Sequence, residues 1–307
     1  MAAPPLVVIA GATATGKTGL SIRLAEAMHA EGIAAEIISA DSRQAYRGLD
    51  IGTAKVSRAE QARVRHHGLD LVDPDQPFSV ADYVAHASAA LAVIGARGGL
   101  AILAGGTGFY LRAVARGLDI EALPSDPVLR AGIEEEIDAR GLAPVAMRLV
   151  GVAPRLAART DLDNRRRVAR ALEIAGLQGD APLPEARGYA GPVAWLGLRV
   201  DPGEHRRVIA DRARAQFDAG LVAEADALRE RFDPELPAFS AIGYREAWAL
   251  LDGEMDREAA IALDVARNIA FARRQATWFR SERDIEWVAP GVDPLAAAVG
   301  RARDLLR

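Results

Sequence analysis

Three short apolar runs, each followed by polar or glycine-rich sequence, set the pattern of the first hundred residues. They are Leu6–Ala10, Glu36–Ala40 and Leu100–Ala104, and helical or loop sequence separates them. Continuous apolar runs of this length are typical of parallel strands that are buried on both faces. The pattern therefore predicts an α/β core with a parallel sheet, in which ligands bind at the carboxyl ends of the strands.

The pattern changes after residue 122. Helical periodicity dominates from there, as in Asp126–Arg140 and Asn164–Leu177, and the Gly- and Pro-rich stretch Gly179–Pro192 follows. We therefore predict that residues 123–190 form a small all-helical insertion domain, and that residues 1–122 form the first part of the core.

Residues 191–307 are expected to complete the core and to add C-terminal helices. Val193–Val200 and Ile285–Val288 have the composition of two further strands. Helical periodicity marks four segments between them: Glu204–Ala219, Leu221–Phe232, Ile242–Leu251 and Arg257–Arg280.

A glycine-rich loop links the first apolar run to a helical pattern. Its sequence, GATATGKT over residues 11–18, has the spacing G-x-x-x-x-G-K-[ST]. In such a phosphate loop, backbone N–H groups and a helix N-terminus cradle phosphate oxygens, the lysine adds a full charge and the final hydroxyl can hold Mg²⁺. The residues expected to bind a di- or triphosphate are Gly11, Thr13, Ala14, Thr15, Gly16, Lys17 and Thr18, with Mg²⁺ at Thr18.

Composition narrows the picture in a few respects. The 307 residues are half apolar, carry a formal net charge of −4 and include no cysteine. Disulfides, thiolate metal sites and a cysteine nucleophile are thereby excluded, and a cytoplasmic location is expected. No window has the roughly 18 consecutive apolar residues of a membrane span.

The basic residues are unusual in kind. Only Lys17 and Lys55 are lysines, so 36 of the 38 basic residues are arginines. Because a compact ammonium and a planar guanidinium serve different purposes, the two lysines are candidates for work that arginine cannot do. Arginines cluster at positions 165, 166, 167 and 170 and again at 267, 273, 274 and 280. Each cluster fits either a local basic groove or a solvated helix face.

The segment Asp41–Lys55 and several later motifs resemble the tRNA dimethylallyltransferase family. Its sequence, DSRQAYRGLDIGTAK, matches the family's D-S-x-Q-[VI]-Y-[RK]-x-[ML]-D-I-G-T-A-K except at Ala45, where the family usually has Val or Ile. Further matches follow in order at His66–Asp73, Gly105–Leu111, Arg166–Glu173, Ala241–Glu246 and Arg274–Arg280. The resemblance extends over roughly residues 6 to 281.

The resemblance implies one reaction. A dimethylallyl group moves from dimethylallyl diphosphate to N6 of the adenosine just 3′ of the anticodon, at tRNA position 37, in tRNAs that read codons starting with U. The products are N6-dimethylallyladenosine and diphosphate, so the phosphate loop would hold a leaving group. The resemblance also implies that Asp41 is the general base, that Thr107 contacts the reacting centre and that Arg212 approaches the diphosphate.

Recognition of tRNA is expected at three places: beside Asp41, on the helical insertion, and at the C-terminal cluster that includes Arg274 and Gln275. A stacked base must be flipped before it reacts, and Ser42, Arg43 and Gln44 lie beside Asp41, where they would read adenine and its neighbours. By resemblance, the helical insertion grips the anticodon stem-loop. The residues expected to contact tRNA are Asp41, Ser42, Arg43, Gln44, Thr107, Arg166, Arg167, Val168, Ala169, Arg170, Arg274 and Gln275.

Some positions depart from the family pattern. Val208 stands where an arginine usually faces the diphosphate, with Arg207 beside it, and Asn268-Ile269 stand where a Thr-Arg pair is common, with Arg267 nearby. Either neighbouring arginines substitute or donor binding is weaker, because a shift of one helical residue turns a side chain by about 100°.

Alternatives to these assignments remain. Asp41 could be a helix cap or a Mg²⁺ ligand, and Thr107 a helix cap. The pair His66-His67 is expected to be structural or RNA-contacting rather than metal-binding. Other activities would be transfer to free adenylate, a small-molecule kinase, or a nucleotide-binding switch. We expect a monomer that partners tRNA and no membrane.

Overall fold

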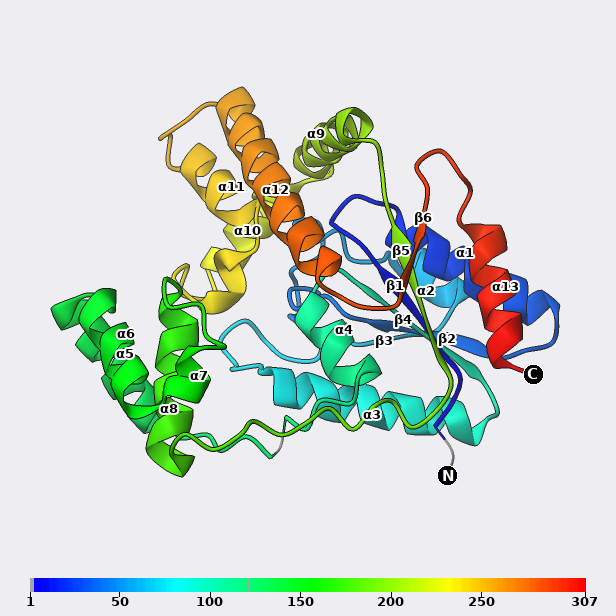
Figure 1. Ribbon diagram of the computed structural model, residues 1–307. Helices are drawn as coiled ribbons and strands as arrows, with labels where there is room; N and C mark the ends of the chain where they lie inside the picture. The colour runs from blue at the N-terminus through cyan, green and yellow to red at the C-terminus, as the bar shows by residue number, and fades with distance from the viewer. Residues whose placement is uncertain (1–2, 121) are drawn as a thin grey trace. The chain divides into compact units, whose positions relative to one another are not determined.

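The computed structural model describes residues 3–120 and 122–307, which form two compact units (Figure 1). The first unit, residues up to 117 together with 188–307, carries a parallel sheet whose strand order is β3-β2-β4-β1-β5-β6. The strands are β1 (Leu6–Ala10), β2 (Ala35–Ser39), β3 (His66–His67), β4 (Leu100–Gly105), β5 (Val193–Leu198) and β6 (Ile285–Val288). The predicted α/β class with a parallel sheet is confirmed.

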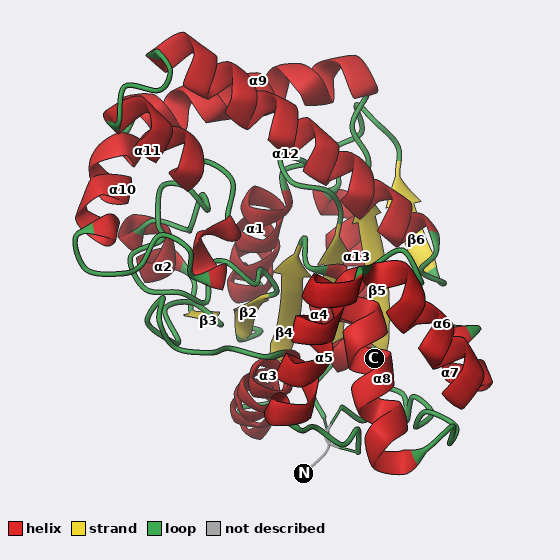
Figure 2. Cartoon of the chain, turned by 90° about the vertical axis from the view of Figure 1, so that its left-hand side faces the viewer, coloured by secondary structure: helices red, strands yellow, loops and turns green. Residues whose placement is uncertain are grey.

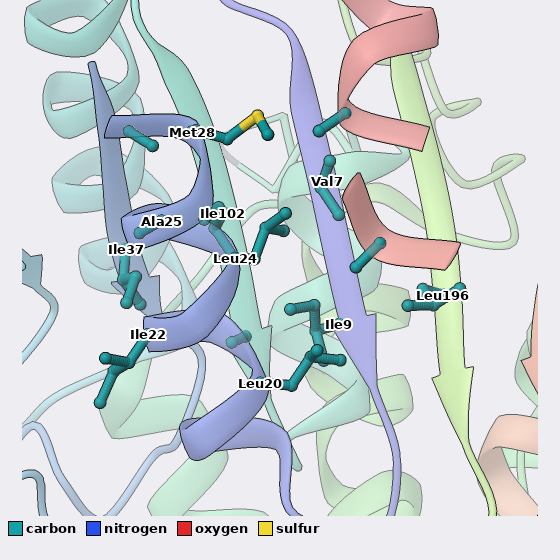
Figure 3. Packing of buried hydrophobic residues seen from close by; sticks show 14 of the residues in the cluster. Val7, Ile9, Leu20, Ile22, Leu24, Ala25, Met28, Ile37, Ile102 and Leu196 are labelled. Carbon is teal, nitrogen blue, oxygen red and sulfur yellow. The ribbon is translucent and has the colours of Figure 1, made fainter. Parts of the chain in front are cut away.

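Strand β1 explains why the sheet needs helices on both faces. Its five residues are fully buried, and alternate side chains enter two different cores. Val7 and Ile9 pack with helices α1 (Lys17–Ala30) and α13 (Leu295–Leu305), as Figure 3 shows for the α1 side. The other alternate residues pack with α3 (Val80–Ala96) and α4 (Gly108–Ala115). A strand buried in this way has no polar face, hence its continuous apolar sequence.

Five further helical elements lie between β5 and β6 in the chain. They are α9 (Pro202–Asp218), α10 (Leu221–Arg229), the 3₁₀ helix η1 (Pro237–Ser240), α11 (Tyr244–Leu251) and α12 (Arg257–Arg280). They share a separate core around Phe239, Tyr244 and Trp248. In Figure 2 the strand arrows point toward the side of the unit where α9 and α12 lie. These helices therefore cover the edge at which ligands of parallel sheets bind.

The second unit, residues 118–187, contains α5 (Pro127–Arg140), α6 (Leu142–Val152), α7 (Pro154–Ala157) and α8 (Arg165–Gln178). The apolar sides of these helices form one core of their own. Asp126 and Asn164 cap α5 and α8 with their side chains, which explains why these helices begin where the sequence indicated. The predicted boundaries were 123 and 190.

The ends of this insertion are anchored in the first unit. Gly188 N donates a hydrogen bond to Arg116 O at 3.0 Å. A Cβ on Gly117, whose φ is +59°, would come within 2.2 Å of Gly188 O, so only glycine allows this approach. The chain thus leaves and re-enters the α/β unit at adjacent points.

Several elements differ from expectation. Strand β2 begins and ends one residue earlier, β3 is a two-residue strand at His66–His67, and α13 has no counterpart in the prediction. The bounds of β4, β5, α9, α10 and α11 also shift by one to three residues, and α2, α3, α6, α7 and η1 were not predicted individually. The short helix α2 (Arg58–Arg63) is held by a capping box between Ser57 and Glu60. None of the helices formed by the described residues is long and apolar enough to cross a bilayer.

Candidate active site

The phosphate loop lies between β1 and the first turn of α1. A Cβ on Gly11 would stand 2.9 Å from Thr15 Oγ1 and 3.1 Å from Leu198 O, so the loop passes close to the end of β5. Gly16 (φ +86°) and Ala14 (φ +59°) both have left-handed backbones. This geometry turns the backbone sharply before α1 begins at Lys17, as a phosphate-cradling loop requires.

Lys17 is the ammonium group of the loop. Its Nζ donates a hydrogen bond to Ala12 O at 2.5 Å. Burial lowers the pKa of Lys17 to about 8, with the Asp41 carboxylate opposing this shift and Arg212 adding to it. The group is therefore still mainly charged at neutral pH, and an incoming anion would raise its pKa.

Two adjoining cavities lie beyond the loop. The first is lined by Lys17, Thr18, His66 and the two glycines at the end of β4, and the second by Ser42, Thr107, Arg267 and Arg274. Five residues line both cavities: Thr13, Asp41, Thr53, Arg212 and Phe271. The carboxylate of Asp41 and the guanidinium of Arg212 thus lie where the two cavities meet.

The carboxyl ends of β2 and β4 are joined directly around Asp41 and Thr107. Asp41 Oδ1 accepts a hydrogen bond from Arg43 N at 2.9 Å, and Thr107 Oγ1 accepts one from Ser42 N at 3.0 Å. A Cβ on Gly105 would stand 2.1 Å from Ala40 O, so this approach requires glycine. Thr107 precedes α4 but makes no side-chain cap, and the bond of Asp41 closes a local turn. Neither residue behaves as the helix cap weighed above.

Arg212 is a cation with unused hydrogen-bonding capacity. Its Nη2 donates to Asn268 Oδ1 at 3.2 Å, while its buried Nε has no partner among the residues that the structure describes. Burial lowers the pKa of Arg212, with the carboxylates of Asp264 and Asp41 opposing this shift. A buried donor without a partner is costly, so its presence in a cavity indicates an acceptor that arrives from outside.

Gln275 ties two loops of the site together. Its Oε1 accepts from Thr13 N at 2.7 Å, and its Nε2 donates to Gly106 O at 2.9 Å. The side chain is buried. These contacts brace the phosphate loop against the loop after β4, and the RNA contact expected of Gln275 stays a prediction.

Gln44 and Arg43 also have partners inside the protein. Gln44 Oε1 accepts from Ser39 Oγ, and its Nε2 donates to the carbonyls of residues 53 and 54. Arg43 donates to Pro237 O at 2.9 Å and to Ser240 Oγ at 2.6 Å. Both side chains hold loops at the rim of the site, and their contact with adenine stays a prediction.

The predicted RNA-contacting helix of the insertion is α8, and its residues differ in exposure. Val168 and Ala169 are fully buried in the core of the helical unit, so their side chains face away from any ligand. Arg170 donates to Pro124 O and pairs with buried Glu173 at 2.7 Å. Arg166 and Arg167 are exposed, Arg167 lying 3.6 Å from an Asp161 oxygen. Of the five α8 residues expected to contact tRNA, only Arg166 and Arg167 have exposed side chains, and contact of any of the five with RNA stays a prediction.

The departures from the family pattern have a structural answer. Arg207 is exposed and lines neither cavity, and Arg267 pairs with buried Glu246 at 2.5 Å on the side of the second cavity. Neither arginine therefore replaces the residue that the pattern usually has. Asn268 instead contacts Arg212, as described above.

Two residues of the site neighbourhood were not understood from sequence. Lys55 is caged by Asp50 Oδ1 and Asp70 Oδ1, both at 2.6 Å, and by Tyr46 O at 2.9 Å. Three acceptors around one nitrogen match an ammonium and not a planar guanidinium. His66 Nδ1 lies 2.8 Å from Val64 O, and its buried Nε2 has no partner within the described ranges although the ring lines the first cavity. His67 pairs with Glu36 at 2.6 Å.

The site has few groups for a metal. Among the described residues no cluster of three His, Cys, Asp or Glu side chains could hold an ion. Thr18 is exposed at the first turn of α1 and lines the first cavity together with Asp41. This set fits Mg²⁺, which takes one or two protein oxygens and completes its shell with phosphate oxygens and water.

The sheet, the phosphate loop and the paired cavities define a phosphate-loop α/β protein with two adjoining cavities beside that loop. Residues 44–282 match the IPP transferase family, and the chain belongs to that family of prenyl-transferring enzymes.

Similar proteins cover nearly the whole chain. The tRNA dimethylallyltransferase of Anaeromyxobacter sp. (strain K) is 46% identical over 298 residues, 95% of either chain. The tRNA dimethylallyltransferase of Roseiflexus sp. (strain RS-1) is 44% identical over 90% of either chain. The crystal structure of a tRNA isopentenylpyrophosphate transferase from Bacillus halodurans superposes with a TM-score of 0.70 at 34% identity, covering 98% of this chain and 97% of that one.

Proposed function

We propose that this chain is a tRNA dimethylallyltransferase: it transfers a dimethylallyl group from dimethylallyl diphosphate to N6 of adenosine 37, in tRNAs that read codons starting with U. The products are N6-dimethylallyladenosine and diphosphate. The observation that carries the proposal is the meeting of two cavities at Asp41, one lined by phosphate-binding groups and the other open toward Ser42 and Thr107.

The first cavity would bind the donor. Negative charge builds on the diphosphate as the bond from its oxygen to C1 of the dimethylallyl group breaks. Backbone N–H groups of the phosphate loop, the Lys17 ammonium and the Arg212 guanidinium would stabilise that charge more in the transition state than in the ground state. The partnerless Nε of Arg212 supplies a donor for a phosphate oxygen.

Thr18 is the residue that would hold Mg²⁺ beside the diphosphate. When bound, the ion neutralises part of the charge on the leaving group. The protein's own cations remain in place around it, and Lys17 stays protonated because the diphosphate lies next to it.

Asp41 would accept the proton that N6 loses. The exocyclic amine of adenine is a poor nucleophile because its lone pair is delocalised into the ring. As the N6–C1 bond forms, one N–H proton must leave, and a carboxylate where the two cavities meet is placed to take it. The hydroxyl of Thr107, tied to Ser42 N, would contact the amine from the side of β4.

The second cavity would receive the flipped adenosine, with Ser42, Arg43 and Arg274 around it. Exposed Arg166 and Arg167 of the helical unit would contact RNA phosphates. Since the acceptor is tRNA, we expect the protein to act in the cytoplasm, and we propose that it acts as a monomer.

The test is transfer of labelled dimethylallyl diphosphate to unmodified tRNA with Mg²⁺. We expect incorporation by the unaltered chain, and a loss of about 10²- to 10⁴-fold in Asp41→Ala, the usual contribution of a general base. An anticodon stem-loop that carries guanosine at position 37 is the matched acceptor control and should take up no label.

Two other results would replace the proposal. Label in free AMP but not in tRNA would indicate an adenylate isopentenyltransferase. Turnover of ATP without RNA would indicate a small-molecule kinase. An Asp41→Ala variant as active as the unaltered chain would remove the assigned base while leaving the reaction in place.

A further inference from the structure

Helix α12 carries a short polar row where its neighbours are apolar. Asp264 and Asn268 lie four residues apart and so share one face of the helix. Both are buried, Asp264 with 1% and Asn268 with 6% of its surface exposed. The surrounding helix contributes Ile261, Ala272 and partly buried Val265 and Ile269 to apolar clusters. Buried polar groups are retained at a cost, so this row requires a physical reason.

The row forms a chain of hydrogen bonds that ends at the cavity. Asn268 Nδ2 donates to Asp264 Oδ1 at 2.8 Å, and Asn268 Oδ1 accepts from Arg212 Nη2 at 3.2 Å. Because the amide donates at one end and accepts at the other, its orientation is fixed by both partners. Arg212 and Asn268 both line the second cavity, and Arg212 lines the first as well.

A neutral amide between two opposite charges has a specific consequence. Arg212 and Asp264 attract each other, yet no direct ion pair between them occurs among the residues that the structure describes. A direct pair would bind both guanidinium edges to an internal carboxylate and remove the cation from the cavity. Asn268 instead holds one Nη group and leaves Nε without a partner.

We propose that Asn268, oriented by Asp264, is a positioning residue that holds the Arg212 guanidinium toward the donor diphosphate. Asn268 thereby takes the place of the Thr-Arg pair expected at 268-269. The assignment of the anion as a diphosphate rests on the proposed function. The chain thus secures its second cation with an amide acceptor rather than with an additional arginine.

Arg267 does not supply an additional cation to the first cavity. Its guanidinium pairs with Glu246 Oε1 at 2.5 Å, and Glu246 Oε2 accepts from Gly243 N at 2.9 Å. Glu246 is fully buried, so Arg267 is tied to the start of α11. Arg267 lines the second cavity only.

The experiment measures binding of inorganic diphosphate by calorimetry, with no tRNA present. Asn268→Leu keeps the volume and removes the acceptor, and we expect the dissociation constant to rise about tenfold, as for one lost hydrogen bond to a charged group. Asn268→Thr restores a hydroxyl that can accept from Arg212 and should recover part of the affinity. Leu263→Ala, exposed on the same helix and lining neither cavity, is the matched control.

A double-mutant cycle separates positioning from a structural role. In an Arg212→Gln background, Asn268→Leu should cause no further loss of diphosphate binding. Equal tenfold losses in both backgrounds, or unchanged binding by Asn268→Leu, would overturn the proposal. In steady-state transfer, KM for the donor should rise more than KM for tRNA, although Asn268 also lines the cavity proposed for the adenosine.

These outcomes are independent of the activity itself. A chain that binds diphosphate in an Asn268-dependent way but transfers nothing to tRNA would refute the proposed function and support the role of Asn268. A chain that prenylates tRNA with Asn268→Leu as well as with asparagine would do the reverse.

Discussion

The half-buried arginines of the two units are held in opposite ways. In the helical unit, Arg170 and Arg130 both donate to Glu173, which is fully buried and also accepts from Asp126 N at 2.7 Å. In the α/β unit, Arg212 meets only a neutral amide and keeps a buried Nε without a partner in the described part of the chain. In the helical unit, the arginines and the glutamate are paired with one another. In the α/β unit, Arg212 keeps a hydrogen-bond donor that is available to a ligand.

The difference distinguishes an arginine that stabilises a fold from one that is kept for a ligand. Burial by itself would raise the pKa of Glu173, but hydrogen bonds from Arg130, Arg170 and Asp126 N hold that pKa at about 2. The buried negative charge of Glu173 is thus stabilised by hydrogen bonds from its neighbours within the helical unit. The pKa of Arg212 is also lowered, but for an arginine this means that burial disfavours the charged form, which the carboxylates of Asp264 and Asp41 only partly offset. A phosphate group would correct this imbalance.

The largest effect should come from removing Glu173, the shared partner of Arg130 and Arg170. Glu173→Ala leaves two guanidiniums without their carboxylate, and we expect a loss of about 3 kcal/mol in the free energy of unfolding of the helical unit. Hydrogen exchange should then quicken over residues 127–178, while affinity for inorganic diphosphate is retained. An equal loss of diphosphate binding would mean that the two units do not act separately.

Removing Arg212 should have the opposite effect: activity should fall while stability is retained. Arg212→Gln is expected to lower kcat/KM for prenyl transfer by about 10²- to 10³-fold, as for loss of one charge-stabilising donor. The melting temperature should stay the same or rise, because a desolvated guanidinium with a partnerless Nε is removed. A fall in melting temperature comparable to that of Glu173→Ala would contradict the contrast drawn here.

Asp264 sharpens the comparison through pH. Burial raises the pKa of Asp264 to about 6; Glu246 adds to this, whereas Asn268, Arg212 and Arg267 oppose it. The folded state therefore keeps a proton between about pH 4 and 6 that the unfolded chain releases, so stability from this group falls as pH rises through that window.

Asp264→Asn should remove this dependence. The variant is expected to gain up to about 3 kcal/mol over the unaltered chain at pH 7.5 and much less at pH 4, since two pKa units correspond to about that free energy. Denaturant unfolding at the two pH values measures it. A gain of the same size at both values would show that the carboxylate has an ordinary pKa.

The smallest effect is expected on the surface of the helical unit. Arg166 is exposed and has no ion pair among the described residues. Arg166→Ala should weaken tRNA binding severalfold and reduce the slope of log affinity against log salt by about one. Arg140→Ala, whose side chain pairs with Glu136 at 2.9 Å, is the control and should leave the slope unchanged.

The parts of the molecule that could be predicted from sequence are those with local causes. The phosphate loop is a contiguous motif, and α12 begins at a residue capped by Asp256, so its predicted range Arg257–Arg280 is confirmed. Strand β3 could not be predicted, because its two histidines have no strand-like pattern of their own and form a strand only by pairing with β2. Helix α13 was also not predicted. Its buried alanines pack on β1 and β5, and these contacts join the far end of the chain to the sheet.

Side-chain roles in the site were harder for a physical reason. A sequence shows which groups can donate or accept but not which partner is already present. Gln275 finds its partners 262 and 169 residues away, in the phosphate loop and after β4. Arg170 and Val168 follow the same motif as Arg166, yet tertiary packing turns them inward. Asn268 looked like a loss relative to the family pattern until its contact with Arg212 was seen.

The adjacent ends of the insertion make the helical unit a detachable cassette. Because Gly188 N bonds to Arg116 O, a short glycine bridge could replace residues 118–187 without moving the sheet or the phosphate loop. Long insertions at such closed points cost the host fold little entropy. The RNA contacts proposed for Arg166 and Arg167 therefore belong to a part of the chain that can be exchanged, whereas the phosphate loop and the cavity proposed for adenosine stay in the α/β unit.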